Sequence, residues 1–259
     1  MKPSFGDHVA VAMDGQVAVV TLDRPPHNFV SVDFMRDLSD ALEAVDGSHA
    51  RAIVLQAAGK SFCAGADFGT PTDAVASGMG GISALYDQAV RLFSIETPIV
   101  AAVQGAAVGA GLGLALVADF RIAAPEARFA ANFVKLGFHP GFGLTHTLPR
   151  LIGESRANLM FLTGRRVKAE DGLPWGLVDE VVPLDALRAR ALELAREIAE
   201  NAPLAVIATR KTLRGGLAAA VRAQLIQEHE QQTLLRATED FQEGIRSVAE
   251  RRPGNFAGR

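Results

Sequence analysis

The sequence predicts an α/β fold, because short apolar runs alternate with segments of helical periodicity. Residues 17–22, 52–56 and 99–103 are apolar, often β-branched runs bounded by polar or turn residues, and we expect them to be core strands. Between these runs, apolar residues recur at steps of three and four in 35–45 and 82–92, the pattern of helices with one buried face. This alternation favours an α/β core, with right-handed crossovers wherever the strands are parallel.

The chain changes character after Pro183. Apolar residues at helical spacing mark an amphipathic helix over 187–198, which we expect Asp185 to cap. The remainder is almost entirely helical in pattern, and its charged stretch 217–249 carries apolar positions that need another surface to cover them. We therefore divide the chain into a core, residues 1–198, and a helical C-terminal region, residues 199–259, for which self-association would provide the cover.

Composition and charge exclude several classes of protein. The chain has 259 residues, 49% of them hydrophobic, which suffices for one large core or two modest ones. Its formal net charge of -3 gives no general attraction to phosphate polymers or anionic membranes, so we expect no nucleic-acid and no membrane partner. The single cysteine, Cys63, permits no intramolecular disulfide, and the first residues lack a basic start followed by an apolar stretch. Both features favour a cytoplasmic protein.

One segment, residues 98–118, is about as long and as apolar as a membrane span. Gln104 is its only strongly polar side chain, and glycines recur every four residues from Gly105, a spacing found in membrane helix packing. A proline at its start and Gly105 within it nevertheless punctuate the segment. We interpret it as a buried strand, a turn, and a helix of small residues that ends before Asp119.

Two turns rich in glycine and alanine, residues 61–67 and 105–111, each follow an apolar strand. Backbone N–H groups exposed at such turns, and at the helix start behind Gly109, can donate two hydrogen bonds to one developing oxyanion. The alternative is that small residues only permit tight packing between strands and helices. The glycines do not complete a dinucleotide fingerprint, because Leu114 occupies the third glycine position, which disfavours a nucleotide-dependent oxidoreductase.

Longer stretches around these turns carry a family resemblance. They read Lys60-Ser-Phe-Cys-Ala-Gly-Ala-Asp67-Phe and Pro98-Ile-Val-Ala-Ala-Val-Gln-Gly-Ala-Ala-Val-Gly-Ala-Gly. Other motifs, in order along the chain, are Asp23-Arg24-Pro25 with Asn28, Leu136-Gly137 followed by Pro140-Gly-Phe-Gly143, Leu162-Thr-Gly164, Gly176-Leu-Val-Asp179, and Glu239-Asp-Phe-Gln-Glu-Gly244 with Asn255-Phe256. Together they strongly resemble the crotonase superfamily, the enoyl-CoA hydratase/isomerase family, over nearly the whole chain. The resemblance implies a crotonase-like spiral of ββα units with a C-terminal helical trimerisation region, assembled as a homotrimer or a dimer of trimers.

The resemblance also implies the ligand and the site. It assigns the oxyanion donors to the backbone N–H groups of Ala66 and Ala110, and the substrate to the acyl-CoA thioesters, with coenzyme A as part of the substrate and no separate cofactor. Ala110 stands where the family usually has glycine, which leaves the N–H intact but costs about 1 kcal/mol or more if the position needs a positive φ. The residues expected to bind CoA or substrate are Arg24, His27, Asn28, Ala64, Gly65, Asp67, Phe68, Asn132, Phe133 and Gly141.

The two glutamates that hydratases of this family use are absent. One of them activates water and the other transfers the α-proton, and their positions match Gly113 and Phe133, neither of which can move a proton. The aspartate used by the dienoyl isomerases matches Gly141. The usual routes to hydration and isomerisation are therefore not expected, although the enoyl-CoA hydratase/isomerase family remains the expected assignment.

His139 is the candidate replacement for these carboxylates. It lies two residues before Gly141, in a loop that the family places beside the reacting carbons, and imidazole titrates near neutrality. The alternative is that His139 holds its loop by a hydrogen bond. Neither His27 nor His146, on an expected helix, stands at metal-ligand spacing to His139, so we expect no metal.

Three functions remain open from the sequence. The first is an acyl-CoA enzyme that stabilises a thioester enolate in a backbone oxyanion hole, with atypical acid and base groups. The second is a hydrolase that cleaves a carbon–carbon bond of a β-dicarbonyl thioester with the help of His139. The third is a non-catalytic acyl-CoA-binding protein. Asn132, beside Phe133, is expected to orient substrate or water through its amide, or else to cap a loop.

Overall fold

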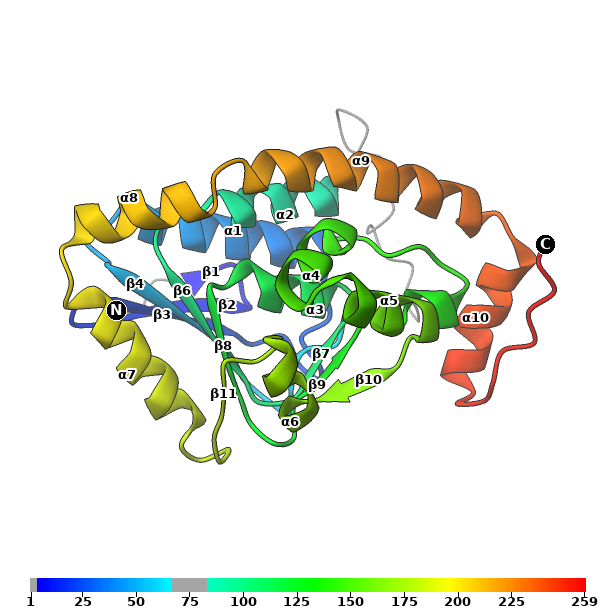
Figure 1. Ribbon diagram of the computed structural model, residues 1–259, viewed down its shortest axis with the longest axis horizontal. Coiled ribbons are helices and arrows are strands. Elements are labelled where there is room, and N and C mark those ends of the chain that lie inside the picture. The colour runs from blue at the N-terminus through cyan, green and yellow to red at the C-terminus, as the bar shows by residue number, and fades with distance from the viewer. Residues whose placement is uncertain (1–3, 67–82) are drawn as a thin grey trace.

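The computed structural model describes residues 4–66 and 83–259 (Figure 1). Its strands are β1 (Ser4–Phe5), β2 (Val9–Asp14), β3 (Val17–Leu22), β4 (Ala52–Ala57), β5 (Ser61–Cys63), β6 (Ile99–Val103), β7 (Ala106–Val108), β8 (Phe120–Ala123), β9 (Arg128–Ala130), β10 (Arg166–Lys168) and β11 (Glu180–Val181). Its helices are α1 (Val32–Asp46), α2 (Ala84–Ser94), α3 (Ala110–Val117), α4 (Leu144–Ile152), α5 (Glu154–Thr163), α6 (Ala169–Gly172), α7 (Leu187–Ala199), α8 (Pro203–Leu213), α9 (Leu217–Arg236) and α10 (Glu239–Ala249), with the 3-10 helices η2 (Asn132–Leu136) and η3 (Leu173–Trp175).

Two sheets organise the described chain. The larger has the strand order β1-β2-β3-β4-β6-β8-β11 and the smaller the order β10-β9-β7-β5. The neighbours from β3 to β11 are parallel, as are β5, β7 and β9. The strands β4, β6 and β8 join the larger sheet, and β5, β7 and β9, which follow them, join the smaller one. With α2 after β5 and α3 after β7, this arrangement confirms the predicted spiral of ββα units.

The central strands read as continuous apolar runs because the sheet buries both of their faces. In β4, Ile53 and Leu55 belong to the main core, whereas Ala52 and Val54 belong to a second cluster on the other face. The second cluster lies under α7, which packs on β4 and β6 and contributes one leucine and three alanines to it. The amphipathic helix predicted after Pro183 therefore covers one face of the larger sheet.

The two helices predicted between the first strands correspond to α1 and α2. Each is capped by a serine, Ser31 for α1 and Ser83 for α2, whose hydroxyl accepts a hydrogen bond from a backbone N–H of the first turn. Ile82, where the second helix was predicted to begin, lies outside the described residues. The predicted cap of α7 by Asp185 is wrong, because Ala186 is its N-cap residue and no side chain caps the helix.

The segment 98–118 forms β6, β7 and α3, and not a single helix. The strand β7 lies where a turn was predicted, because residues 106–108 pair with both β5 and β9 in the smaller sheet. In the part of the chain that the structure describes, no helix is long and apolar enough to cross a membrane.

The C-terminal helices pack on the core (Figure 1). The helix α9 contacts α2 and α4, and α10 contacts η2. Val221 and Leu225 of α9 belong to the main core, so residues 199–259 share that core with the rest of the chain. Leu204, Leu213 and Leu234 remain exposed. Their burial by self-association, in a homotrimer or a dimer of trimers, stays a prediction.

Candidate active site

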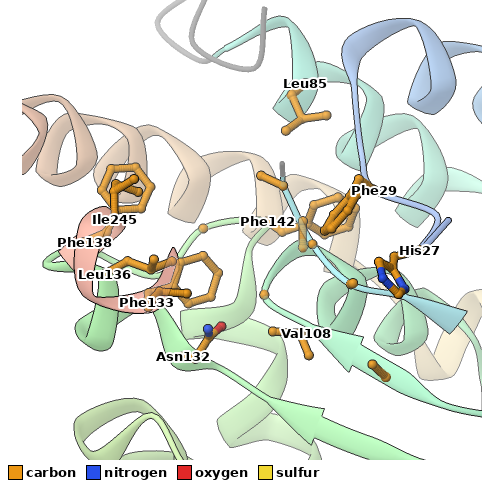
Figure 2. A pocket seen from close by; sticks show the side chains of 18 of the residues that line it. His27, Phe29, Leu85, Val108, Asn132, Phe133, Leu136, Phe138, Phe142 and Ile245 are labelled. Atoms are coloured by element: carbon orange, nitrogen blue, oxygen red, sulfur yellow. The ribbon is translucent and has the colours of Figure 1, made fainter. Parts of the chain in front are cut away.

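A cavity of about 590 Å³ lies between the smaller sheet, α2 and the C-terminal helices. In Figure 2, His27 and Phe29 lie on one side of this cavity, and Phe133, Phe138 and Ile245 lie on the other. The predicted site residues that line it are His27, Ala64, Gly65, Ala66, Ala110, Asn132, Phe133 and Gly141. Arg24, Asn28 and His139 are not among the described lining residues, and the positions of Asp67 and Phe68 lie outside the described residues.

The two predicted donor loops meet at one point of the cavity wall, because β5 and β7 are neighbours in the smaller sheet. Gly65 has a φ of 90°, and a Cβ atom there would lie 2.7 Å from the carbonyl oxygen of Val108 and 4.0 Å from the backbone nitrogen of Ala110. Only glycine allows this approach. The loop that carries the Ala66 N–H therefore touches the loop that carries the Ala110 N–H.

Neither backbone N–H group is engaged within the described residues. Ala110 is the first residue of α3, so its N–H has no acceptor within the helix. Ala66 forms a bridge with Val30, in which the Val30 N–H donates to the Gly65 carbonyl oxygen at 2.9 Å. No described residue accepts a hydrogen bond from the Ala66 or Ala110 N–H. The positive φ at this turn belongs to Gly109, at 56°, and not to Ala110, so the alanine carries no such strain.

Two other glycines of these turns serve packing. A Cβ atom at Gly105 would overlap the carbonyl oxygen of Lys60, and one at Gly111 would overlap that of Cys63. The alternative interpretation of the small residues, tight packing, therefore holds for these two. Gly65 also permits close packing, against Val108, but both Gly65 and Gly109 in addition line the cavity.

Phenyl rings lie beside Gly113 and at Phe133, the positions where the resemblance leads us to expect the family's two glutamates. A Cβ atom at Gly113 would lie 2.7 Å from Cγ of Phe142, which is fully buried and holds a φ of 63°. Phe133 lines the cavity, and its Cζ lies 3.6 Å from where a Cβ at Gly109 would be. A side chain at position 113 thus requires Phe142 to move. No carboxylate is found among the described lining residues, whose polar side chains are His27, Ser61, Tyr86, Asn132, Arg166 and Arg236.

A buried hydrogen-bonded chain surrounds Gly141. The Tyr86 hydroxyl donates to Oε1 of Gln232 at 2.7 Å, and Nε2 of Gln232 donates to the carbonyl oxygen of His139 at 2.9 Å. Because a carbonyl can only accept, this second bond fixes the orientation of the Gln232 amide. A Cβ atom at Gly141 would overlap the Tyr86 hydroxyl. The hydroxyl thus occupies the space into which a side chain at position 141 would project.

The Tyr86 hydroxyl is a neutral group at the cavity. Burial raises its pKa above the ordinary value, and the nearby Glu228 raises it further. The hydroxyl therefore keeps its proton, and an oxygen lone pair remains to accept a hydrogen bond.

His139 holds its own loop. Its Nδ1 lies 2.8 Å from the carbonyl oxygen of Pro140, so Nδ1 must carry the hydrogen and donate it. Nε2 of the neutral ring is then the nitrogen that can accept a proton. The hydrogen bond to Pro140 fits the alternative in which His139 holds its loop. It also leaves the ring in the tautomer that a general base would need, so the catalytic role of His139 stays a prediction.

Asn28 ties the predicted CoA-binding stretch to β5. Its side chain donates to the carbonyl oxygens of Ala58 at 3.0 Å and Ser61 at 2.9 Å, and accepts from the Arg24 N–H at 2.7 Å. Asn28 is only 2% exposed, so it contributes to the site by holding the backbone around residues 24, 58 and 61 in place. Its neighbour His27 lines the cavity, with Nδ1 3.2 Å from the Ser61 hydroxyl.

Glu228 is a buried carboxyl group at the N-terminus of α4. It accepts hydrogen bonds from the N–H groups of Gly143 at 2.8 Å and Thr145 at 2.9 Å, and from the Thr145 hydroxyl. Burial raises its pKa to about 7, against the opposing effect of these hydrogen bonds. It does not line the cavity among the described residues, so its role is to hold α4.

The sequence analysis missed Tyr86 and the part of the cavity that the C-terminal region supplies, namely Arg236, Ile245, Val248 and Ala249. A signal existed for Tyr86, the one tyrosine in the chain, which follows Leu85 on the buried face of a predicted helix. None existed for Arg236, which is one of many charged residues in its helix.

Comparison with known proteins identifies the family of this chain. The family model described as enoyl-CoA hydratase/isomerase matches residues 12–259. A probable enoyl-CoA hydratase of Rhodobacter capsulatus is 39% identical, with 94% of this chain and 95% of the relative covered. The 2,3-dehydroadipyl-CoA hydratase of Escherichia coli is 36% identical, covering 96% and 98%. The crystal structure of an enoyl-CoA hydratase/isomerase from Pseudoalteromonas atlantica has a TM-score of 0.87 at 31% identity, covering 97% of this chain and 100% of that one. The chain therefore belongs to the enoyl-CoA hydratase/isomerase family, with the crotonase fold.

Proposed function

We propose that the protein binds an acyl-CoA thioester and holds its carbonyl oxygen between the N–H groups of Ala66 and Ala110. The observation that carries this proposal is the meeting of two loops, at Gly65, beside two N–H groups that no described residue engages. Preorganised donors of this kind stabilise the negative charge that develops on the carbonyl oxygen as an enolate forms. The N-terminus of α3 adds the positive end of its helix dipole.

Proton transfer in this proposal does not use the family's two glutamates. Phe142 fills the space beside Gly113, and Phe133 lines the cavity in place of the second glutamate. Two other groups are near the acyl side: the Tyr86 hydroxyl on the cavity wall and the imidazole of His139 in the adjoining loop. Hydration, isomerisation and carbon–carbon cleavage all pass through an enolate that the two N–H groups can stabilise. In this proposal the loss of the glutamates therefore leaves enolate stabilisation unchanged and alters only the proton transfers.

Hydration of a 2-enoyl thioester is the reaction to measure first, because relatives that match nearly the whole chain are named as hydratases. Purified protein is mixed with a short trans-2-enoyl-CoA, and loss of the conjugated thioester absorbance is followed, with the product mass determined. A gain in mass of one water would establish hydration by groups other than the two glutamates. No turnover despite CoA-thioester binding would favour the non-catalytic acyl-CoA-binding protein.

The donor itself is tested by Ala110→Pro. Ala110 occupies the first helical position, where proline is well tolerated because its missing N–H has no helical partner. We expect the loss of this donor to lower kcat by about 10²- to 10³-fold. Ala110→Gly, which keeps the N–H, is the matched control and should remain within about tenfold of the wild type. Equal rates for the two variants would contradict the oxyanion proposal.

Carbon–carbon hydrolysis of a β-dicarbonyl thioester is the second candidate. It is favoured by the His139 tautomer, because donation from Nδ1 to the Pro140 carbonyl leaves Nε2 free to activate water. Incubation with a β-dicarbonyl thioester, followed by mass detection of two cleavage products, tests it. Intact thioester after prolonged incubation with active protein would rule this reaction out.

A further inference from the structure

Arg236, the last residue of α9, places a guanidinium on the wall of the cavity without a partner of opposite charge among the described residues. Its Cζ lies 4.9 Å from the centroid of the Phe138 ring, and no hydrogen bond or ion pair joins its side chain to a described residue. The side chain is half-buried, and burial lowers its pKa below the ordinary value. A cation that loses part of its hydration without gaining an anion costs free energy, so its presence on an apolar wall requires a reason.

The position of Arg236 along the cavity is defined by Phe138. Figure 2 shows Phe138 with Leu136 and Ile245 on the side opposite His27 and Phe29. His27 belongs to the stretch assigned to CoA, and the two N–H donor loops lie at the wall near Val108, between the two sides. A thioester with its CoA part beside His27 would therefore extend its acyl chain toward Phe138 and Arg236.

We propose that Arg236 binds a carboxylate at the far end of the acyl group, so that the preferred ligands are CoA thioesters of dicarboxylic acids. This inference rests on the proposed binding of an acyl-CoA thioester in the cavity. The planar guanidinium can form two parallel hydrogen bonds to a carboxylate, and its stacking on Phe138 holds the plane in place. The Tyr86 hydroxyl lines the same cavity and supplies a further polar group there.

Arg166 also lines the cavity but differs from Arg236 in one respect. Arg166 is exposed, so water satisfies its guanidinium, whereas Arg236 is half-buried against an aromatic ring. A carboxylate therefore gains more from Arg236, because hydrogen bonds to a charged group strengthen as water is removed. Arg166 is accordingly the variant that tests the assignment to one arginine.

The test compares two saturated thioesters of equal chain length, hexanoyl-CoA and adipoyl-CoA, by calorimetric measurement of Kd. Neither can be hydrated, so the comparison does not depend on turnover. In the wild type we expect adipoyl-CoA to bind more tightly by about tenfold or more. Arg236→Met should remove this preference and leave the Kd of hexanoyl-CoA nearly unchanged, and Arg236→Lys should retain part of it.

Two further variants serve as controls. Arg222→Met removes the same charge from an exposed position of α9, where the side chain lies 4.0 Å from Asp87, and should keep the preference for adipoyl-CoA. Arg166→Met should keep it as well. Loss of the preference in Arg166→Met but not in Arg236→Met would overturn the assignment.

The remaining outcomes separate this inference from the proposed function. Equal affinity of the wild type for both thioesters would overturn the inference, as would an Arg236→Met variant that weakens both equally, since that would indicate a contact with the CoA part. A preference for adipoyl-CoA that depends on Arg236 supports the inference even if no enoyl thioester is turned over. The protein could instead turn over 2-hexenoyl-CoA and its ω-carboxylated counterpart at equal kcat/KM and bind hexanoyl-CoA and adipoyl-CoA with equal Kd. That result would support the proposed function and overturn the inference.

Discussion

Substitution of Gly141 by alanine tests the buried chain that joins Tyr86, Gln232 and His139. The added Cβ would overlap the Tyr86 hydroxyl and would lie 2.5 Å from Nε2 of Gln232 and 2.7 Å from Cζ of Tyr86. Tyr86 is 7% exposed and Gln232 is 2% exposed, so both side chains are closely packed around Gly141. The methyl group must therefore displace the hydroxyl and its 2.7 Å hydrogen bond to Gln232.

The expected cost has two parts. Insertion of a methyl group against closely packed side chains costs about 1 to 3 kcal/mol. Breaking the Tyr86–Gln232 bond leaves buried polar groups unpaired and costs about 1 to 3 kcal/mol more. We expect Gly141→Ala to lower the free energy of unfolding by roughly 2 to 6 kcal/mol. Equilibrium unfolding in urea, at one protein concentration for all variants, measures this difference.

A double-mutant cycle locates the effect. Tyr86→Phe removes the same hydrogen bond by itself, so its cost in the Gly141→Ala background should fall by about 1 to 2 kcal/mol. Gly47→Ala is the matched control, because a Cβ atom at Gly47 would lie 3.6 Å from the nearest atom and the φ of Gly47 is -79°. We expect this substitution to change the free energy of unfolding by less than about 0.5 kcal/mol. A Gly141→Ala variant as stable as the Gly47→Ala variant, or strict additivity with Tyr86→Phe, would refute the geometry.

Two further predictions concern Glu228 and His139. Because burial raises the native pKa of Glu228 to about 7 from 4.5, the native state binds this proton more tightly, and stability should fall by on the order of 3 kcal/mol as the pH rises from about 5 to about 8. Urea unfolding across this range should show a shallower fall for Glu228→Gln, and identical profiles would contradict the assignment. His139→Ala should destabilise the protein by about 1 kcal/mol through loss of the bond to the Pro140 carbonyl, with kcat within about tenfold of the wild type. A fall of about 10³-fold in kcat at unchanged stability and CoA affinity would instead identify His139 as catalytic.

The sequence by itself determined the elements and the two turns rich in glycine and alanine for which a donor role is proposed. The strands β3, β4 and β6 and the helices α1, α2 and α7 follow from apolar runs and periodicity, which depend on neighbouring residues alone. The small residues of the turns around Gly65 and Gly109 pointed to free backbone N–H groups, since only glycine adopts these conformations without strain. The expectation that Gly113 and Phe133 replace two glutamates also came from the sequence, because the absence of a carboxylate from a stretch of sequence can be read without a structure.

Only the tertiary structure decided which side chains surround the cavity. It placed Phe142 against Gly113, joined Tyr86 to Gln232 and His139, and brought Arg236 of the C-terminal region to the cavity wall. These contacts join residues on different elements, and Tyr86 and Gln232 are separated by 146 positions in the chain. Periodicity states which face of a helix is buried but not which side chain it meets there. The identity of the neighbour, and hence the chemistry of the site, depends on how the sheets and helices pack together.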